Sequence, residues 1–133
     1  MKGLRLYKFE KLCSKRNIDM LFAAKKNSIK SYPILLIYNI KENEGTPAKF
    51  LITVPKKRVR HAVDRVAMRR RIREAYRLNR SLFFPALKDN NLSVDIALLY
   101  IGDTLDNYHH IEAKMKNALS NLSSIITEHA ANR

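Results

Sequence analysis

Apolar residues along this chain follow two patterns, one typical of helices and one typical of strands. Near the N-terminus, Ile18, Leu21 and Phe22 share one helical face, which predicts a short helix over residues 14–24 with Ser14 as its N-cap. Toward the C-terminus, apolar residues at spacings of three and four predict a long helix that begins after a cap at Asp106. Its apolar positions are Ile111, Met115, Leu119, Leu122 and Ile126.

Three apolar segments between these helices predict strands. The first covers residues 32–40 and the second covers residues 50–54, and both are rich in residues that favour strands. The polar segment between them contains Gly45 and Pro47, so we expect the two strands to form an antiparallel hairpin. The third strand, over residues 92–100, alternates at first and then becomes fully apolar, as a strand that enters a core does.

A strongly basic segment separates the second strand from the third. Helical periodicity predicts that one side of this segment carries Arg65, Arg69, Arg70, Arg73, Arg77 and Arg80. The other side, which we expect to pack on the sheet, carries Val63, Ala67, Met68, Ile72, Ala75 and Leu78, with Tyr76 directed toward it. Glu74 is expected to moderate repulsion among the arginines. Arg71 lies on the apolar side, where it could form an ion pair with Asp64.

The order helix, strand, strand, basic helix, strand, helix predicts an α+β fold in a single domain over residues 1–133. We expect a mixed sheet of about four strands with about three helices packed on it. A helix between two strands of one sheet suggests a βαβ crossover, although the order of elements leaves open which strands are parallel.

The net charge of the chain and its distribution indicate which class of molecule the protein binds. The chain has 133 residues, is 46% hydrophobic and carries a formal net charge of +14, and residues 56–80 hold eleven of its 26 basic side chains but two of its 12 acidic ones. Like charges four residues apart cost a free helix about 0.2–0.5 kcal/mol per pair. Arginine forks bind phosphate oxygens in pairs, so a nucleic acid is the partner that would offset this cost.

Other chemistries find less support in the sequence. The four histidines are scattered without metal-ligand spacing and no Gly-rich phosphate loop is present, so neither intrinsic catalysis nor a protein-bound metal is predicted. The single cysteine, Cys13, cannot form an internal disulfide, and no apolar run is long enough to span a membrane, so we expect a cytoplasmic protein. A general RNA-binding module, such as a ribosomal protein or an RNA chaperone, remains an alternative.

The basic segment resembles a known signature. Residues 62–77 read Ala-Val-Asp-Arg-Val-Ala-Met-Arg-Arg-Arg-Ile-Arg-Glu-Ala-Tyr-Arg, which resembles the Ala-Val-x-Arg-Asn-x-x-Lys-Arg-x-x-Arg pattern of the bacterial ribonuclease P protein component. The likeness extends over nearly the whole chain, since the preceding Val-Pro-Lys-Lys sequence and the flanking helices and strands also agree. Two positions depart from the pattern: the family asparagine is here Val66, and the family lysine is Arg69.

This resemblance implies the protein subunit of a ribonucleoprotein endonuclease that removes 5′ leaders from precursor tRNA. Catalysis would belong to the RNA subunit, which would also hold the Mg²⁺ ions, and the protein would act as a monomer in a 1:1 complex. The resemblance also implies a left-handed βαβ crossover, although sequence alone would favour the right-handed one. The candidate RNA-binding residues are Lys56, Lys57, Arg65, Val66, Arg69, Arg70, Arg73 and Arg77.

The resemblance implies a second RNA-binding region, a cleft between the first helix and the sheet that holds the single-stranded leader. The two aromatic positions of the family's first helix fall on Ile18 and Phe22, so one stacking surface is lost here. The aromatic position on the strand falls on Tyr38. A register slip of one residue would place Ile37 there instead and would turn Tyr38 to the opposite face.

Overall fold

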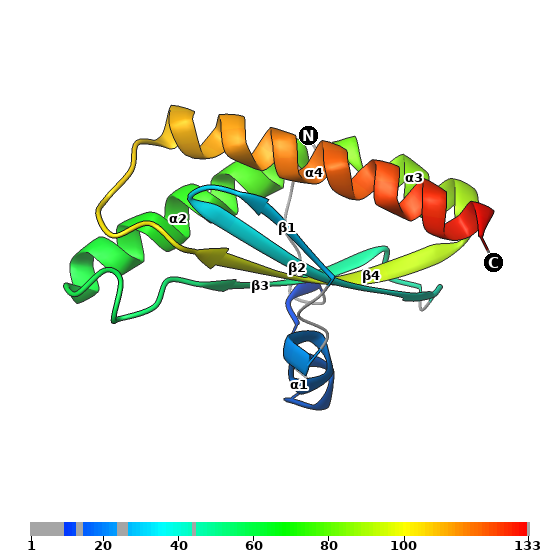
Figure 1. Ribbon diagram of the computed structural model, residues 1–133, viewed down its shortest axis with the longest axis horizontal. Helices are drawn as coiled ribbons and strands as arrows, with labels where there is room; N and C mark the ends of the chain where they lie inside the picture. Colours follow the sequence, from blue (N-terminus) through cyan, green and yellow to red (C-terminus); the bar gives the residue numbers. More distant parts are fainter. Residues whose placement is uncertain (1–9, 13–14, 24–26, 44, 133) are drawn as a thin grey trace.

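The computed structural model describes residues 10–12, 15–23, 27–43 and 45–132. The elements in chain order are α1 (Lys15–Ala23), β1 (Ser28–Ser31), β2 (Ile34–Glu42), β3 (Ala48–Thr53), α2 (Ala62–Asn79), a 3₁₀ turn (Arg80–Leu82), α3 (Phe84–Asn90), β4 (Leu92–Tyr100) and α4 (Tyr108–Ala131). Helices α2, α3 and α4 cover one face of a four-stranded sheet, and α1 lies against the other (Figure 1). The predicted α+β class is confirmed.

The strand order is β1-β2-β4-β3, so β4 lies between β2 and β3. It pairs antiparallel with β2 and parallel with β3, and the predicted hairpin of residues 32–40 with 50–54 is therefore wrong. The physical reason is burial: every residue of β4 except Leu99 is buried, whereas β2 and β3 both carry several half-buried residues. The strand that is apolar on both faces takes the central position.

The parallel pair β3 and β4 is joined through α2, which confirms the expected βαβ unit. Figure 1 shows α2 and β3 behind the hairpin of β1 and β2, with the helix above the sheet, and the chain turns in the left-handed sense as it passes from β3 to β4. This crossover sets α2 along the outer side of the sheet, next to the edge strand β3.

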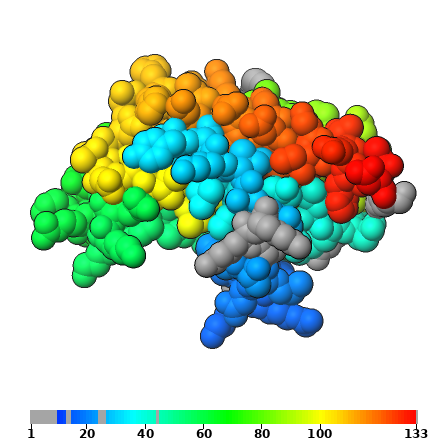
Figure 2. Space-filling model, in the orientation of Figure 1, coloured from blue at the N-terminus to red at the C-terminus, as the bar shows by residue number. Residues whose placement is uncertain are grey.

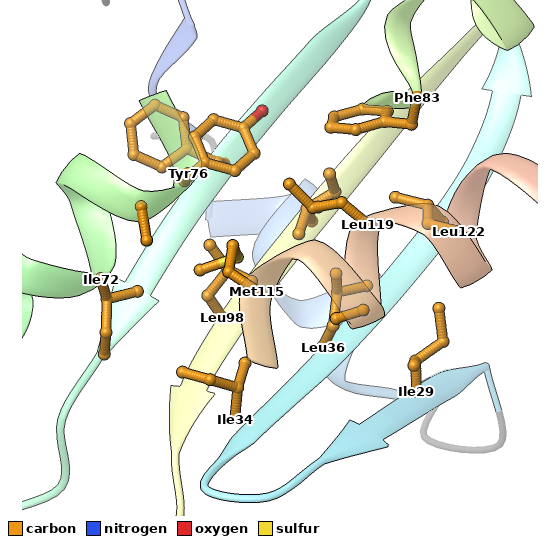
Figure 3. Packing of buried hydrophobic residues seen from close by; sticks show 14 of the residues in the cluster. Ile29, Ile34, Leu36, Ile72, Tyr76, Phe83, Leu98, Met115, Leu119 and Leu122 are labelled. Carbon is orange, nitrogen blue, oxygen red and sulfur yellow. The ribbon is translucent and has the colours of Figure 1, made fainter. Parts of the chain in front are cut away.

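Two apolar clusters cover the two faces of the sheet. The larger one joins the sheet to α2 and α4, with Ile72, Tyr76, Leu98, Met115 and Leu119 near its centre (Figure 3). All five apolar positions predicted for the long C-terminal helix are buried. The smaller cluster consists of Leu12, Leu21, Ile37 and Ala97, with α1 packed on it. Successive side chains of β4 thus point to opposite faces of the sheet and contribute to different clusters.

Two short elements, β1 and α3, were not predicted. The four residues of β1 contain one apolar side chain, Ile29, so no periodicity marks them. The seven residues of α3 begin at Phe84, with Pro85 in the first turn, and end before Asn91, whose φ of 54° is left-handed. Both are recognised start and stop signals. The predicted cap Ser14 lies outside the described residues, and α1 is described from Lys15 onward.

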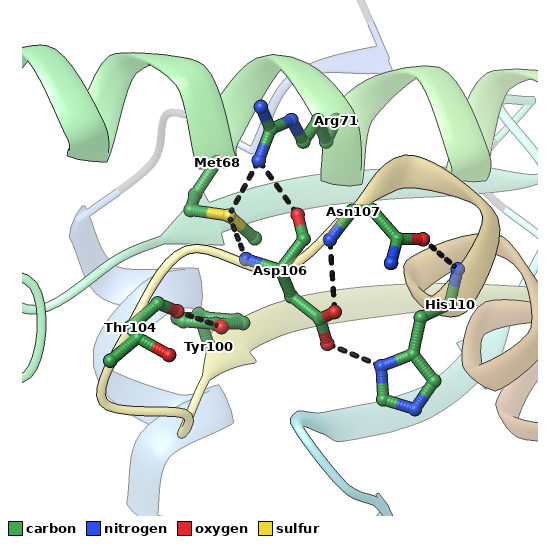
Figure 4. A network of polar contacts seen from close by, with 7 residues as sticks. All are labelled: Met68, Arg71, Tyr100, Thr104, Asp106, Asn107 and His110. Carbon is green, nitrogen blue, oxygen red and sulfur yellow. Dashed lines mark hydrogen bonds and ion pairs between the residues drawn. The ribbon is translucent and has the colours of Figure 1, made fainter.

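The connection from β4 to α4 is bound to α2. Asn107, and not the predicted Asp106, caps α4, because its side-chain oxygen accepts from the N–H of His110 at 2.9 Å. The carbonyl oxygen of Asp106 accepts from Arg71 at 2.7 Å, and its N–H lies 3.4 Å from the sulfur of Met68 (Figure 4). The expected ion pair between Arg71 and Asp64 is therefore wrong, and Arg71 fixes this connection instead.

Among the described helices, none combines the length and the apolar character needed to cross a lipid bilayer.

Candidate nucleic-acid interface

Helix α2 divides into a buried side and a solvent-facing side. Met68, Ile72, Ala75 and Tyr76 are buried, and burial raises the pKa of the Tyr76 hydroxyl well above its usual range. Val63 was expected on the packed side but is 79% exposed. The N-terminal end of α2, which begins at Ala62, projects beyond the ends of the strands (Figure 1). The solvent-facing arginines form two groups, which differ in whether their side chains make hydrogen bonds to other residues of the protein.

Arg69, Arg70 and Arg73 form the first group, which we name the arginine face. The side chains of Arg70 and Arg73 are exposed and that of Arg69 is half-buried. Within the described part of the chain, none of the three makes a hydrogen bond or an ion pair with the protein. Their guanidinium groups therefore keep their donors available for a ligand.

Arg65 and Arg77 belong to the second group. Arg65 donates to the carbonyl oxygens of Val59 at 3.0 Å and Arg60 at 2.8 Å. Arg77 donates to Glu74 at 3.1 Å, and this hydrogen bond is the main reason that the pKa of the Glu74 carboxyl is lowered. The predicted role of Glu74 in moderating the charge is thus confirmed, while these two arginines already have partners within the protein.

Arg80 does not belong to the solvent-facing side, where the helical pattern had placed it. The helix ends at Asn79, and the Arg80 side chain is 4% exposed and forms an ion pair with the buried Glu10. Its guanidinium also lies over the ring of Phe84, 5.5 Å from the ring centroid. A buried acidic partner distant in sequence carries no periodic signal, so sequence analysis could not identify it.

The basic loop of residues 56–61 precedes α2, and several contacts hold it in place in addition to the hydrogen bonds from Arg65. The N–H of Val59 donates to the carbonyl of Pro55 at 3.0 Å, and the Val59 side chain is buried. Arg58 lies 3.2 Å from the carboxylate of Asp103 in the connection after β4. The loop directs its remaining polar side chains to the surface, where a hollow is lined by Lys56, Lys57, Arg60 and His61.

The second predicted region lies on the opposite face of the sheet, beneath α1. Ile18 and Phe22 are half-buried and pack against the cluster that contains Ile37. Tyr38 points to the other face and joins the cluster under α4, where burial and then the charge of Glu128 raise its pKa. The structure therefore brings Ile18 and Phe22 together but not Tyr38. The alternative register, with Ile37 beneath α1, is the one that occurs.

The same sheet face carries polar residues that the motif analysis did not select. Asp95 is 2% exposed on the central strand, and its carboxylate lies 2.9 Å from the ammonium of Lys41 on β2. Lys49 on β3 is the direct register partner of Asp95. A carboxylate in a largely apolar strand is a signal that the sequence shows, because a buried charge requires a nearby partner.

Figure 2 shows how the two regions lie relative to each other. The N-terminal turns of α2 and the helix α1 project as separate lobes, and the surface between them is hollowed. Val66 lies on the solvent-facing side of α2 and is 47% exposed, so it adds an apolar contact surface next to the arginine face. Across the described ranges, no group of three His, Cys, Asp or Glu side chains is placed to hold a metal ion.

Comparisons with known proteins agree on one family. A family model described as Ribonuclease P matches residues 6–123. The ribonuclease P protein component of Porphyromonas gingivalis is 30% identical over 126 residues, which cover 94% of this chain and 91% of that protein. The protein of the same name from Chlorobaculum tepidum is 36% identical over 102 residues, which cover 68% of this chain and 66% of that protein.

Solved structures show the same fold at lower identity. The RNase P protein of Thermotoga maritima superimposes with a TM-score of 0.65 at 19% identity, covering 84% of this chain and 96% of that one. The RNase P protein of Staphylococcus aureus gives a TM-score of 0.64 at 16% identity, covering 85% and 94%.

Proposed function

This chain belongs to the ribonuclease P protein family, and from that premise we propose that it is the RNA-binding protein subunit of a ribonuclease P that matures the 5′ ends of tRNA. Its partners would be a catalytic RNA, in a 1:1 complex, and precursor tRNA. The RNA would perform the phosphodiester hydrolysis and hold the Mg²⁺, and the protein would work in the cytoplasm. The observation that carries the proposal is the arginine face, three guanidinium groups on one side of a packed helix that make no hydrogen bond or ion pair with any of the residues the structure describes.

Two surfaces of the protein suit two different parts of the RNA. The arginine face and the basic loop suit the phosphates of a folded RNA, because clustered guanidinium and ammonium groups gain affinity by releasing counterions. The half-buried Ile18 and Phe22 beneath the sheet suit an unpaired leader, whose bases can pack on apolar side chains. A leader that passes from α1 toward α2 would cross the hollow between the two lobes (Figure 2).

Reconstitution tests the assignment directly. We expect the protein alone not to cleave precursor tRNA, and we expect cleavage at moderate Mg²⁺ once the cognate catalytic RNA is added. Precursor tRNA should also compete better than mature tRNA for the reconstituted complex, because only the precursor carries a leader. Cleavage by nuclease-treated, RNA-free protein would contradict the assignment of catalysis to the RNA. Equal competition by the two tRNAs would favour the alternative, a general RNA-binding module.

Arg65 is expected to act by holding the basic loop, since one of its nitrogens already donates to two carbonyl oxygens. Arg65→Met removes the donor and the charge, and it should lower RNA affinity by about tenfold, the worth of one charge-assisted hydrogen bond, as measured by fluorescence anisotropy with labelled RNA. The same variant should also loosen the loop in the free protein, seen as faster hydrogen exchange at the Val59 amide, which donates within this loop. An affinity loss with unchanged exchange would instead indicate that Arg65 contacts a phosphate directly.

A further inference from the structure

Residues 10–12, which precede α1, attach the chain to both faces of the sheet. On the face covered by α2 and α3, the buried carboxylate of Glu10 forms an ion pair with Arg80. At the sheet edge, the N–H of Leu12 donates to the carbonyl of Phe50 on β3 at 2.8 Å. On the opposite face, the Leu12 side chain is buried in the cluster beneath α1. The segment therefore passes around the edge strand β3 from one face of the sheet to the other.

The ion pair between Glu10 and Arg80 fixes this segment to the end of α2. Arg80 follows Asn79, the last residue of α2, and its guanidinium lies over the ring of Phe84. Burial and then the charge of Glu10 raise the pKa of the Tyr76 hydroxyl, so the carboxylate also lies close to the packed side of α2. Loss of either charge would leave the other buried without compensation, so the two residues hold each other in place. The segment before α1 thus has a defined position relative to the helix that carries the arginine face.

Helix α1 is short and largely exposed. Of its nine residues, all of which the structure describes, Leu21 alone is buried. Isolated helices shorter than about 12–15 residues are marginally stable in water, so a helix of this length depends on its attachment to the rest of the protein. Figure 1 shows that α1 projects away from the sheet. Two residues separate Leu12 from Lys15, where α1 begins, so a movement of Leu12 also moves the start of the helix.

We propose that the ion pair between Glu10 and Arg80 positions α1 for leader binding and thereby sets how strongly the ribonucleoprotein prefers precursor over mature tRNA. The two residues are positioning residues, because both are buried in the core and act through Ile18 and Phe22 on α1. The inference rests on the proposed function and adds to it a determinant of substrate preference that lies outside both RNA-binding surfaces. Breaking the pair leaves a buried charge without its counter-ion, which favours local opening of residues 10–12 toward water.

The test measures the competition of precursor and mature tRNA for the complex of the full chain with its cognate catalytic RNA. Glu10→Gln removes the negative charge with little change in size. The preference for precursor tRNA should fall by about fivefold, the lower end of what one base stacked on an aromatic side chain contributes. The affinity of the protein for the catalytic RNA should not change, because the arginine face stays intact. Glu10→Leu with Arg80→Met replaces the ion pair by an apolar contact and should restore the preference.

Leu122→Ala is the matched control for a general loss of stability. It shortens a fully buried side chain of α4 in the larger apolar cluster, and it should keep the preference for precursor tRNA. Hydrogen exchange separates the two variants. The amides of Leu12 and Leu21 should exchange faster in Glu10→Gln, because the segment and α1 open locally. In Leu122→Ala, exchange should instead rise at amides that open only on global unfolding, such as that of Leu98 on the central strand.

Two outcomes would overturn the inference: an unchanged preference in Glu10→Gln despite faster exchange at Leu12, or an equal loss of preference in Leu122→Ala. Failure of the proposed function gives a different result, because the complex with the unmodified protein would then bind both tRNAs equally. The exchange measurement would still decide the role of the ion pair in that case. Unchanged exchange at Leu21 in Glu10→Gln would show that the pair does not position α1.

Discussion

Replacement of Arg69, Arg70 and Arg73 together by alanine is expected to weaken RNA binding by at least about 100-fold, since hydrogen bonds to charged groups contribute roughly 1.5–3 kcal/mol each. The slope of log affinity against log salt should become shallower by about one unit per lost phosphate contact. The protein should still fold, because none of the three side chains is buried. Fluorescence anisotropy with labelled catalytic RNA over a range of salt concentrations measures affinity and slope together.

Arg77→Ala provides the matched control for this variant. It removes one positive charge from the same helix, against three in the triple variant, but the Arg77 side chain is already bound to Glu74. Such exposed pairs contribute about 0–1 kcal/mol, so we expect RNA affinity to change by less than about threefold and the salt slope to stay nearly constant. If Arg77→Ala reduced the slope as much as each member of the arginine face does, the distinction between bound and available arginines would be wrong.

The helical period predicted the direction of these arginines but not their partners. The spacing of residues determines the direction in which each side chain leaves the helix axis, and this was sufficient to predict that Arg69, Arg70 and Arg73 face solvent. Arg65 turns back to a loop carbonyl and Arg80 reaches an acidic residue near the start of the chain. Both contacts depend on where other segments are brought by the tertiary fold, and local periodicity contains no information about that.

The strands illustrate the same limit. The apolar runs located β2, β3 and β4 to within two residues, because burial on one or both faces selects residue types. Their order was wrong, since a turn-rich segment between two strands permits pairing but does not require it. The face of Tyr38 depended on a one-residue register, which is fixed by the pairing with β4 and not by the strand's own sequence.

The ion pair between Arg80 and Glu10 leads to the second prediction, which concerns stability. Both side chains are almost fully buried, at 4% and 7% exposure, and the pair joins the segment before α1 to the end of α2. Removing one partner leaves the other charge buried without compensation, so Arg80→Ala is expected to lower the free energy of unfolding by about 3–5 kcal/mol. Urea denaturation followed by circular dichroism measures this loss.

The double variant Arg80→Met with Glu10→Leu separates the effect of charge from that of packing. Buried ion pairs can often be replaced by apolar side chains of similar volume at little cost, so this variant should recover most of the stability lost in Arg80→Ala. Its RNA affinity and salt slope should match those of the unmodified protein, because Arg80 lies in the core and not on the arginine face. A double variant that folds stably but loses a unit of salt slope would mean that Arg80 leaves the core to bind RNA. The buried ion pair between Arg80 and Glu10 would then open when RNA binds.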